Sequence, residues 1–141
     1  MKKLILAVLL APGIAFGGPL IALSAGDSII VAETAASEAS RALGLMGRDH
    51  LDRNHGMLFV FGRPGRYRMW MKNTLLPLSV AFMDERGTIL NIEDMAPLTL
   101  DLHASKGDAA YALEMEQGWF RAHHVRPGER LEGLPPLTPQ P

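Results

Sequence analysis

Tyr-Arg-Met-Trp-Met-Lys-Asn-Thr-Leu-Leu-Pro-Leu-Ser-Val-Ala-Phe-Met-Asp, residues 67–84, is the stretch that decides the fold. Its first part alternates, so that Met69 and Met71 share one face of a predicted strand and Trp70 takes the other. Residues 78–83 form an apolar run that contains valine and phenylalanine, which is typical of a buried strand. Between the two runs lie polar residues suited to a turn. The stretch therefore predicts a strand, a polar turn and a second strand.

The polar turn is also the best candidate for a binding site. The face of Trp70 can stack on a sugar or another planar ligand, and Lys72 and Asn73 bring hydrogen-bond donors close to it. A structural interpretation competes, in which Trp70 is a core residue, Asn73 forms an Asx turn and Thr74 bonds to the backbone at the end of the strand. We expect two residues of the preceding loop to contribute to the same surface. The predicted ligand-binding residues are Trp70, Lys72, Asn73, Thr74, Arg48 and His55.

The flanking sequence predicts a domain rich in β-strands. Residues 28–32 and the apolar run 57–61 are predicted strands, the second of them central in the sheet. Residues 84–87 predict a hairpin turn that ends on a glycine, followed by a strand over 88–92. A long loop follows, and then a strand over 110–115.

Helical spacing is found at two places. Thr34 is a candidate N-cap of an amphipathic helix that ends near Gly44 or Gly47, and residues 117–123 predict a short second helix before a last strand at 130–131. The predicted class is therefore α+β, with a mainly antiparallel sheet that is open or curled into a barrel. One N-terminal helix and one short C-terminal helix flank the sheet.

The N-terminus has the pattern of a targeting segment. Lys2 and Lys3 precede an apolar run over 4–10, which is too short to span a membrane. Small residues offer two cleavage sites, Ala15-Phe16-Gly17 and Ala22-Leu23-Ser24. We expect a signal peptide over 1–25, export to the periplasm or the medium, and no membrane span after cleavage; a retained N-terminal anchor is the alternative. Residues 26–134 would then form one globular domain, and the proline-rich residues 135–141 a disordered tail.

Composition excludes several classes of function. Without Lys2 and Lys3, 12 basic residues stand against 15 acidic ones, and this mildly acidic balance argues against nucleic acid as a partner. The chain contains no cysteine, which rules out disulfides, thiol catalysis and iron–sulfur clusters. The oligomeric state is not determined by these features.

Methionine and histidine raise the question of a metal. Met69 and Met71 share a predicted strand face, and clustered thioethers can bind copper(I). Methionine also fills irregular cores well, and this second interpretation is favoured because the methionines lie in apolar segments. His50, Asp52 and His55 occur together in one polar loop, where such a triplet arises easily by chance. We therefore predict no metal and no cofactor, and keep metal handling as an alternative.

Paired carboxylates raise the question of an enzyme. Glu114 or Glu93, acting with His55, could serve as general acid and base of a hydrolase. The chain has no Gly-x-Ser-x-Gly nucleophile motif. A non-enzymatic domain that binds a small polar ligand, an envelope polymer or a protein partner through residues 70–74 is therefore the favoured prediction.

Several motifs, taken in order, resemble a known family. They are residues 41–48 (RALGLMGR), 55–61 (HGMLFVF), 69–78 (MWMKNTLLPL), 95–97 (MAP) and 112–120 (ALEMEQGWF). The chain is similar over about residues 28–131 to the bacterial and archaeal domain-of-unknown-function family 192, an uncharacterised family of exported or membrane-tethered domains. The resemblance implies a compact, mostly β domain. It implies no established activity, substrate or cofactor, and no catalytic residue is carried over.

Overall fold

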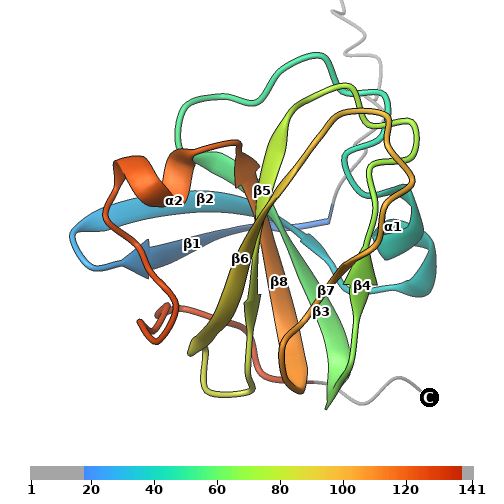
Figure 1. Ribbon diagram of the computed structural model, residues 1–141. Helices are drawn as coiled ribbons and strands as arrows, with labels where there is room; N and C mark the ends of the chain where they lie inside the picture. Colours follow the sequence, from blue (N-terminus) through green and yellow to red (C-terminus); the bar gives the residue numbers. More distant parts are fainter. Residues whose placement is uncertain (1–17, 138–141) are drawn as a thin grey trace, which may run out of the picture.

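The computed structural model describes residues 18–137 of the chain, and Figure 1 shows their arrangement. Two short helices and eight strands are found in this range: β1 (Leu20–Ala25), β2 (Ser28–Ala35), α1 (Glu38–Leu43), β3 (His55–Gly65), β4 (Arg68–Met69), β5 (Leu78–Met83), β6 (Ile89–Met95), β7 (His103–Ala104), β8 (Ala109–Glu116) and α2 (Trp119–Ala122). The β-rich class predicted from the sequence is confirmed.

Six of the strands form one strongly twisted sheet in the order β1-β2-β3-β8-β5-β6, and β4 pairs with β7 in a small second sheet. Neighbouring strands of the large sheet are antiparallel except β2 and β3, which are parallel. Parallel neighbours need a long crossover connection. Residues 36–54, which include α1, provide it here. This parallel pair was not anticipated from the sequence.

The large sheet is not closed into a barrel, so that alternative of the sequence prediction is wrong. β1 and β6 are its two edges. A last strand was predicted at residues 130–131, but this segment makes only isolated bridges, from Arg130 to Thr88 and from Glu132 to Ser24. The C-terminal segment thus contacts both edges without joining them into a continuous ladder.

The predicted N-terminal helix needs correction. The expected amphipathic helix, capped by Thr34 and ending near Gly44 or Gly47, is not found with those bounds, because Thr34 and Ala35 belong to β2. α1 begins after Ser37, whose side chain accepts the amide N–H of Ser40, and it has no buried residue. A six-residue helix capped by Ser37 replaces the predicted packed helix, since Thr34 and Ala35 extend the strand instead.

The hairpin between β5 and β6 agrees with the prediction. Asp84 Oδ1 accepts the backbone N–H groups of Arg86 and Thr88, both at 2.9 Å. Gly87 has φ of 84°, the left-handed conformation expected for the glycine of this turn.

The sheet has a hydrophobic core on each face. One core lies under α2 and the C-terminal segment and includes Leu58, Leu113 and Phe120. The other includes Phe59, Met71 and Phe82, and it is covered by β4, the following turn and Leu45. Figure 1 shows α2 and the β4–β7 pair on opposite sides of the sheet. The second core is the one that supports the candidate site.

The predicted signal peptide, residues 1–25, and the predicted tail, residues 135–141, fall partly outside residues 18–137. The apolar run 4–10 and the site Ala15-Phe16-Gly17 lie outside the described residues, whereas residues 20–25, the end of the predicted signal peptide, form β1. Of the proline-rich tail, Pro135 accepts the hydroxyl of Tyr111 at 2.5 Å. Among the described residues, no helix is long and apolar enough to span a membrane.

Candidate ligand-binding pocket

Residues 70–74 form a turn that is held in place by backbone hydrogen bonds from two other loops. The N–H of Met71 donates to the carbonyl of Thr99 at 3.1 Å, and the carbonyl of Thr74 accepts from Leu98 at 3.0 Å. Asn73 has φ of 53° and its carbonyl accepts from Gly47 at 2.9 Å. The predicted strand over 67–71 is therefore shortened to β4, because after Met69 the chain bonds to residues 98–99 instead of continuing a ladder.

Two residues of this turn are buried and three are exposed. Met71 is fully buried and Thr74 is 5% exposed, with its hydroxyl donating to the carbonyl of Lys72 at 3.1 Å. Trp70 is 44% exposed, and the ammonium nitrogen of Lys72 lies 5.3 Å from the centroid of its ring. Trp70 and Lys72 thus form a cation–π pair on the surface, while Thr74 has the backbone-bonding role of the structural interpretation.

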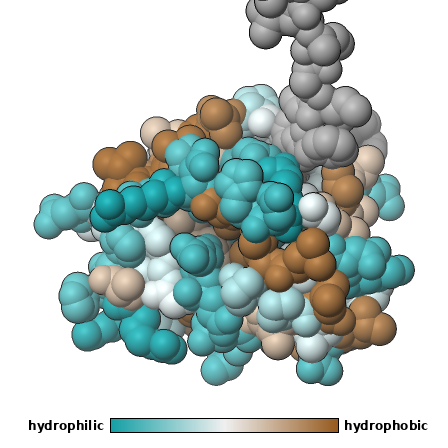
Figure 2. Space-filling model, turned by 90° about the horizontal axis from the view of Figure 1, so that it is seen from above, coloured by the Kyte–Doolittle hydropathy of each residue, from teal (hydrophilic) through white to brown (hydrophobic). Residues whose placement is uncertain are grey.

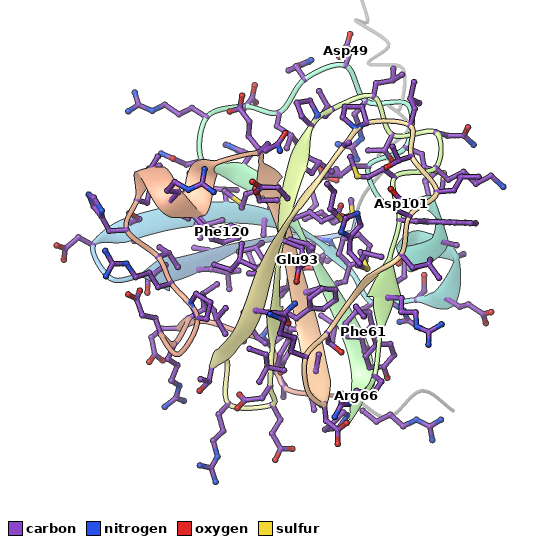
Figure 3. The ribbon with its side chains drawn as sticks, in the orientation of Figure 1. Asp49, Phe61, Arg66, Glu93, Asp101 and Phe120 are labelled. Atoms are coloured by element: carbon purple, nitrogen blue, oxygen red, sulfur yellow. The ribbon has the colours of Figure 1, made fainter. Side chains whose placement is uncertain are left out.

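Trp70 and Thr74 line a pocket of about 310 Å³ between α1 and the sheet. Besides Trp70, three aromatic residues line it: Phe59 and Phe61 come from β3, and Tyr67 precedes β4. The rings of Phe61 and Tyr67 stack at a centroid distance of 3.8 Å and an interplanar angle of 9°. Figure 3 labels Phe61 near the end of β3, on the side of the sheet where β4 lies. Residues of α1 and the following segment 44–46 complete the wall.

A carboxyl group, that of Glu114 on β8, also lines the pocket. The residue is 4% exposed, and its strand register places it between Met57 of β3 and Val80 of β5. Within residues 18–137, no hydrogen bond or ion pair reaches this carboxyl group. Every fully enclosed side-chain oxygen in that range has a hydrogen-bond partner. Because the oxygens of Glu114 have none, they are not fully enclosed, and they are accessible from the pocket. Glu114 is therefore a buried polar group whose natural partner would be a pocket occupant.

Burial of Glu114 changes its chemistry. Loss of hydration raises the pKa of its carboxyl group to about 8, because the ionised form is penalised by the apolar surroundings. At neutral pH the group is a carboxylic acid with one donor and one acceptor. It can pair with a polar group without introducing a charge.

The remaining predicted site residues lie elsewhere. Both carboxylate oxygens of Glu33 accept from Arg48 at 2.8 Å, and this bond lowers the pKa of Glu33. His55 starts β3, and its Nδ1 lies 3.0 Å from the carbonyl of Arg53. Neither Arg48 nor His55 lines the pocket, and Lys72 and Asn73 also lie outside its wall. Of the six predicted residues, the pocket brings together Trp70 and Thr74.

The most informative residue of the pocket, Glu114, was considered in the sequence only as a hydrolytic acid. The sequence nevertheless contained an indication of its importance, because Glu114 is the one acidic residue in the apolar run 109–115. An acid in a buried strand either has a partner or serves a function. The aromatic walls were not predicted, since Phe59, Phe61 and Tyr67 read as ordinary strand residues.

A second hollow, of about 470 Å³, lies beside α2 and contains Ser79, Asp94 and Arg121. These three side chains are already bonded to one another or to the backbone. Ser79 donates to Asp94 at 2.6 Å and accepts from the N–H of Gly118 at 3.0 Å, and Arg121 lies 3.6 Å from Asp94. These bonds join β5, β6 and α2. The polar side chains of this hollow therefore have a structural role, whereas no such role is found for the carboxyl group of Glu114.

The alternatives of metal and hydrolase chemistry can be compared with the same geometry. In residues 18–137, no group of three or more histidine and acidic side chains is gathered as for a metal ion. Met71 is buried in the core and Met69 packs against that core. Glu93 lies in the same row across the sheet as Glu114, with Val80 between them, and it accepts from Asn91 at 2.9 Å. Glu93, labelled in Figure 3, lies on the edge strand β6, and it does not line the pocket.

The surface near the turn is partly apolar. Figure 2 shows brown patches among hydrophilic side chains on the face that carries the loops at the top of Figure 1. The large exposed apolar residues contributed by the loops 70–77 and 96–102 are Trp70, Leu75, Leu98, Leu100 and Leu102. Of these five residues, Trp70 also lines the pocket.

Three comparisons relate the chain to known proteins. The model of the family DUF192, described as "Uncharacterized ACR", matches residues 21–133. The structure resembles a crystal structure from Sinorhizobium meliloti 1021, described as a "putative transcription regulator", with a TM-score of 0.76 and 37% identity over 81% of this chain and 92% of the other. It also resembles a protein of unknown function from Novosphingobium aromaticivorans DSM 12444, with a TM-score of 0.73 and 27% identity over 80% and 83% of the two chains. The comparison with curated proteins gave no match.

Proposed function

Because the chain belongs to the DUF192 family, whose description assigns no activity, we propose from the pocket itself that this is a binding domain for a small ligand with a ring. The observation that carries the proposal is the unpaired, buried carboxyl group of Glu114 at a pocket with aromatic walls. Small-molecule sites combine an apolar wall with a few polar groups in this way. A volume of about 310 Å³ fits one ring-sized ligand.

Trp70 has the position of a contact residue at the pocket wall. Its exposed ring offers a face for stacking, and Lys72 holds a positive charge beside it. Of the predicted binding surface, residues 70–74, we therefore propose Trp70 as the ligand contact and Lys72 as the charged residue beside it. Asn73 and Thr74 contribute by holding the turn.

Binding is favoured over hydrolysis by the separation of the carboxylates. A hydrolase needs an acid and a base that face one substrate. Glu33 and Glu93 each lie two strands from Glu114 in the same row, and neither lines the pocket. Glu38 does line it but is exposed on α1, and His55, the predicted partner of Glu114 in a hydrolase, lies outside the wall. Regulation of transcription, the description given to the S. meliloti protein, finds no support in the mildly acidic charge of this chain. Export of the domain to the periplasm or the medium remains part of the proposal, supported by Lys2, Lys3 and the apolar run 4–10.

The test is an NMR titration with toluene and phenol as ring probes. We expect at least one probe to shift the indole N–H of Trp70 and the amides of Phe59 and Glu114. Ala42 lies on the exposed side of α1 and lines the pocket, so Ala42→Trp should fill the pocket and abolish these shifts. Ala39→Trp, on the same helix but outside the pocket, is the matched control and should leave them unchanged. Absence of shifts with both probes, or equal shifts in both tryptophan variants, would refute the proposal.

A further inference from the structure

The carboxyl group of Glu114 has a hydrogen-bonding capacity that residues 18–137 do not use. Burying a polar group without a partner costs about 1–3 kcal/mol, so an occupant that bonds to it recovers part of that cost. Its strand neighbours on either side, Met57 and Val80, are apolar and offer no donor. The inference that follows rests on the proposed ligand-binding function, and it concerns the chemical class of the ligand.

Charged groups around the carboxyl group come from several elements. Glu38 and Arg41 of α1 and Arg68 of β4 line the pocket, and Arg41 is tied to the carbonyls of Ala36 and Val60 at 2.7 and 3.0 Å. Beyond the pocket wall, Lys72 lies over Trp70.

The sheet itself adds two acids, and both are engaged. Glu33 of β2 is paired with Arg48, and Glu93 of β6 accepts from Asn91. Each is two strands away from Glu114, or about 10 Å at the usual strand spacing. The pocket wall therefore carries two arginines and one exposed acid besides Glu114. This balance disfavours a cationic ligand, although the aromatic walls alone would suit one.

The aromatic walls favour a flat ligand. The stacked pair Phe61 and Tyr67, together with Phe59 and Trp70, presents ring faces and edges against which a planar ring can pack. A carboxylic acid offers a donor and an acceptor side by side. The complementary group is one that also carries an acceptor next to a donor, as a primary or cyclic amide does.

We propose that this pocket binds a neutral planar ring with an amide-like edge, whose adjacent acceptor and donor pair with the carboxyl group of Glu114. Specificity against a ring that lacks such an edge then comes from leaving Glu114 unpaired. Below pH 8 the carboxyl group keeps the proton that it donates in this pairing, because burial raises its pKa to about 8. Above that pH the donor is lost and a buried negative charge faces the ligand.

The experiment compares benzamide with benzoate and benzamidinium, which share its shape but carry opposite charges, and with toluene, which has the ring alone. Dissociation constants are measured by NMR titration of the full-length protein at pH 6.5. We expect benzamide to bind at least about tenfold more tightly than toluene, since one or two hydrogen bonds are worth that factor. Benzamidinium and benzoate should bind more weakly than benzamide. Tightest binding of benzamidinium would instead indicate a cation site, and tightest binding of benzoate an anion site; either result overturns the proposal.

Two variants test the role of Glu114 directly. Glu114→Met keeps the length of the side chain without a polar group, and it should weaken benzamide about tenfold while leaving toluene unchanged. Glu114→Gln keeps a donor and an acceptor at every pH. Between pH 6.5 and 9.5 benzamide affinity should fall at least about tenfold in the wild type and stay constant in Glu114→Gln. If Glu114→Met fails to fold, the comparison of wild type and Glu114→Gln across pH still tests whether Glu114 pairs with the ligand.

The outcomes separate this inference from the proposed function. Toluene shifts at the pocket together with equal benzamide affinity in wild type and Glu114→Met would leave the binding domain in place and overturn the amide-like ligand. Failure of every ring probe, toluene and phenol included, would remove the proposed function and this inference together.

Discussion

Arg48 donates to both carboxylate oxygens of Glu33 at 2.8 Å, and this pair ties the segment after α1 to β2. Both side chains are about one-quarter exposed, at 23% and 24%. A bidentate and partly buried pair is stronger than the usual surface ion pair. Arg48, predicted from the sequence as a ligand contact, therefore has a structural role that can be measured.

Arg48→Met should destabilise the fold by about 1–3 kcal/mol at pH 7, because hydrogen bonds to charged groups are worth that much. The pKa of Glu33 is lowered in the folded state, so its contribution is present above the unfolded pKa and is lost as the pH falls through the folded pKa. Urea unfolding should therefore show a smaller difference from wild type at pH 3. Arg66→Met removes an exposed pair with Asp108 and serves as control, with an expected cost below about 0.5 kcal/mol. Equal costs for the two variants would contradict the assignment.

Glu114 should make stability depend on pH in the opposite direction. Its pKa is raised in the folded state from 4.5 to about 8, so the folded chain holds a proton that the unfolded chain has released. The contribution of this proton to the free energy of unfolding is fully present below pH 4.5. It is lost as the pH rises toward 8, at about 1.4 kcal/mol per pH unit. Comparing urea unfolding of wild type and Glu114→Gln at pH 5, 6, 7 and 8 isolates this slope. Parallel curves for the two proteins would show that Glu114 ionises normally.

Lys72→Ala should leave the free energy of unfolding within about 0.5 kcal/mol, since Lys72 is exposed and bonds to no buried group through its side chain. Asn73→Ala, by contrast, places a residue without a turn-forming side chain at a φ of 53° and should cost about 1 kcal/mol. Thermal unfolding of the two variants beside wild type provides the measurement. A loss of several kcal/mol in Lys72→Ala would assign this lysine to the fold instead of the binding surface.

Methionines 69 and 71 should behave as packing residues. Met71→Leu conserves volume in a fully buried position and should cost less than about 1.5 kcal/mol, whereas Met71→Ala should cost about 2–5 kcal/mol. Met69→Leu should be milder still, because Met69 is only partly buried. Titration with copper(I) against a competing chelator should give no stoichiometric binding in wild type. One-to-one uptake that Met69→Leu or Met71→Leu abolishes would support metal handling instead.

The mature N-terminus should lie at or close to Gly18. Cleavage after Ala22-Leu23-Ser24 would remove most of β1, whose Leu23 is 1% exposed in the core and whose Ser24 bonds to Glu132. Cleavage after Ala15-Phe16-Gly17 preserves the whole strand. Mass spectrometry of the protein recovered from the producing cell decides between them. A chain that begins at Met1 in the membrane fraction would indicate a retained anchor.

The sequence was informative wherever a local pattern carries its own physical cause. Alternation and apolar runs predicted β3, β5 and β8, and Asp84 with Gly87 predicted the hairpin, because a turn depends on only a few adjacent residues. The sequence-based prediction failed where local helix propensity competes with burial against a neighbouring strand. The alanines after Thr34 suit a helix, but Ala35 is instead buried in β2 beside Phe59, and helix propensity is too weak to outweigh such burial.

The sequence by itself determined the β-rich class, the family, the absence of cysteine chemistry and the interest of Trp70. Only the tertiary structure decided that β2 and β3 run parallel, that the sheet stays open, and that Arg48 and His55 lie away from the pocket. It also placed Glu114 among Phe59, Phe61, Tyr67 and Trp70, which are separated from it by more than 40 residues of chain. The physical reason is that burial and pairing depend on which strands become neighbours. An acid in an apolar run becomes a buried and unpaired group only when the strands beside it supply no donor.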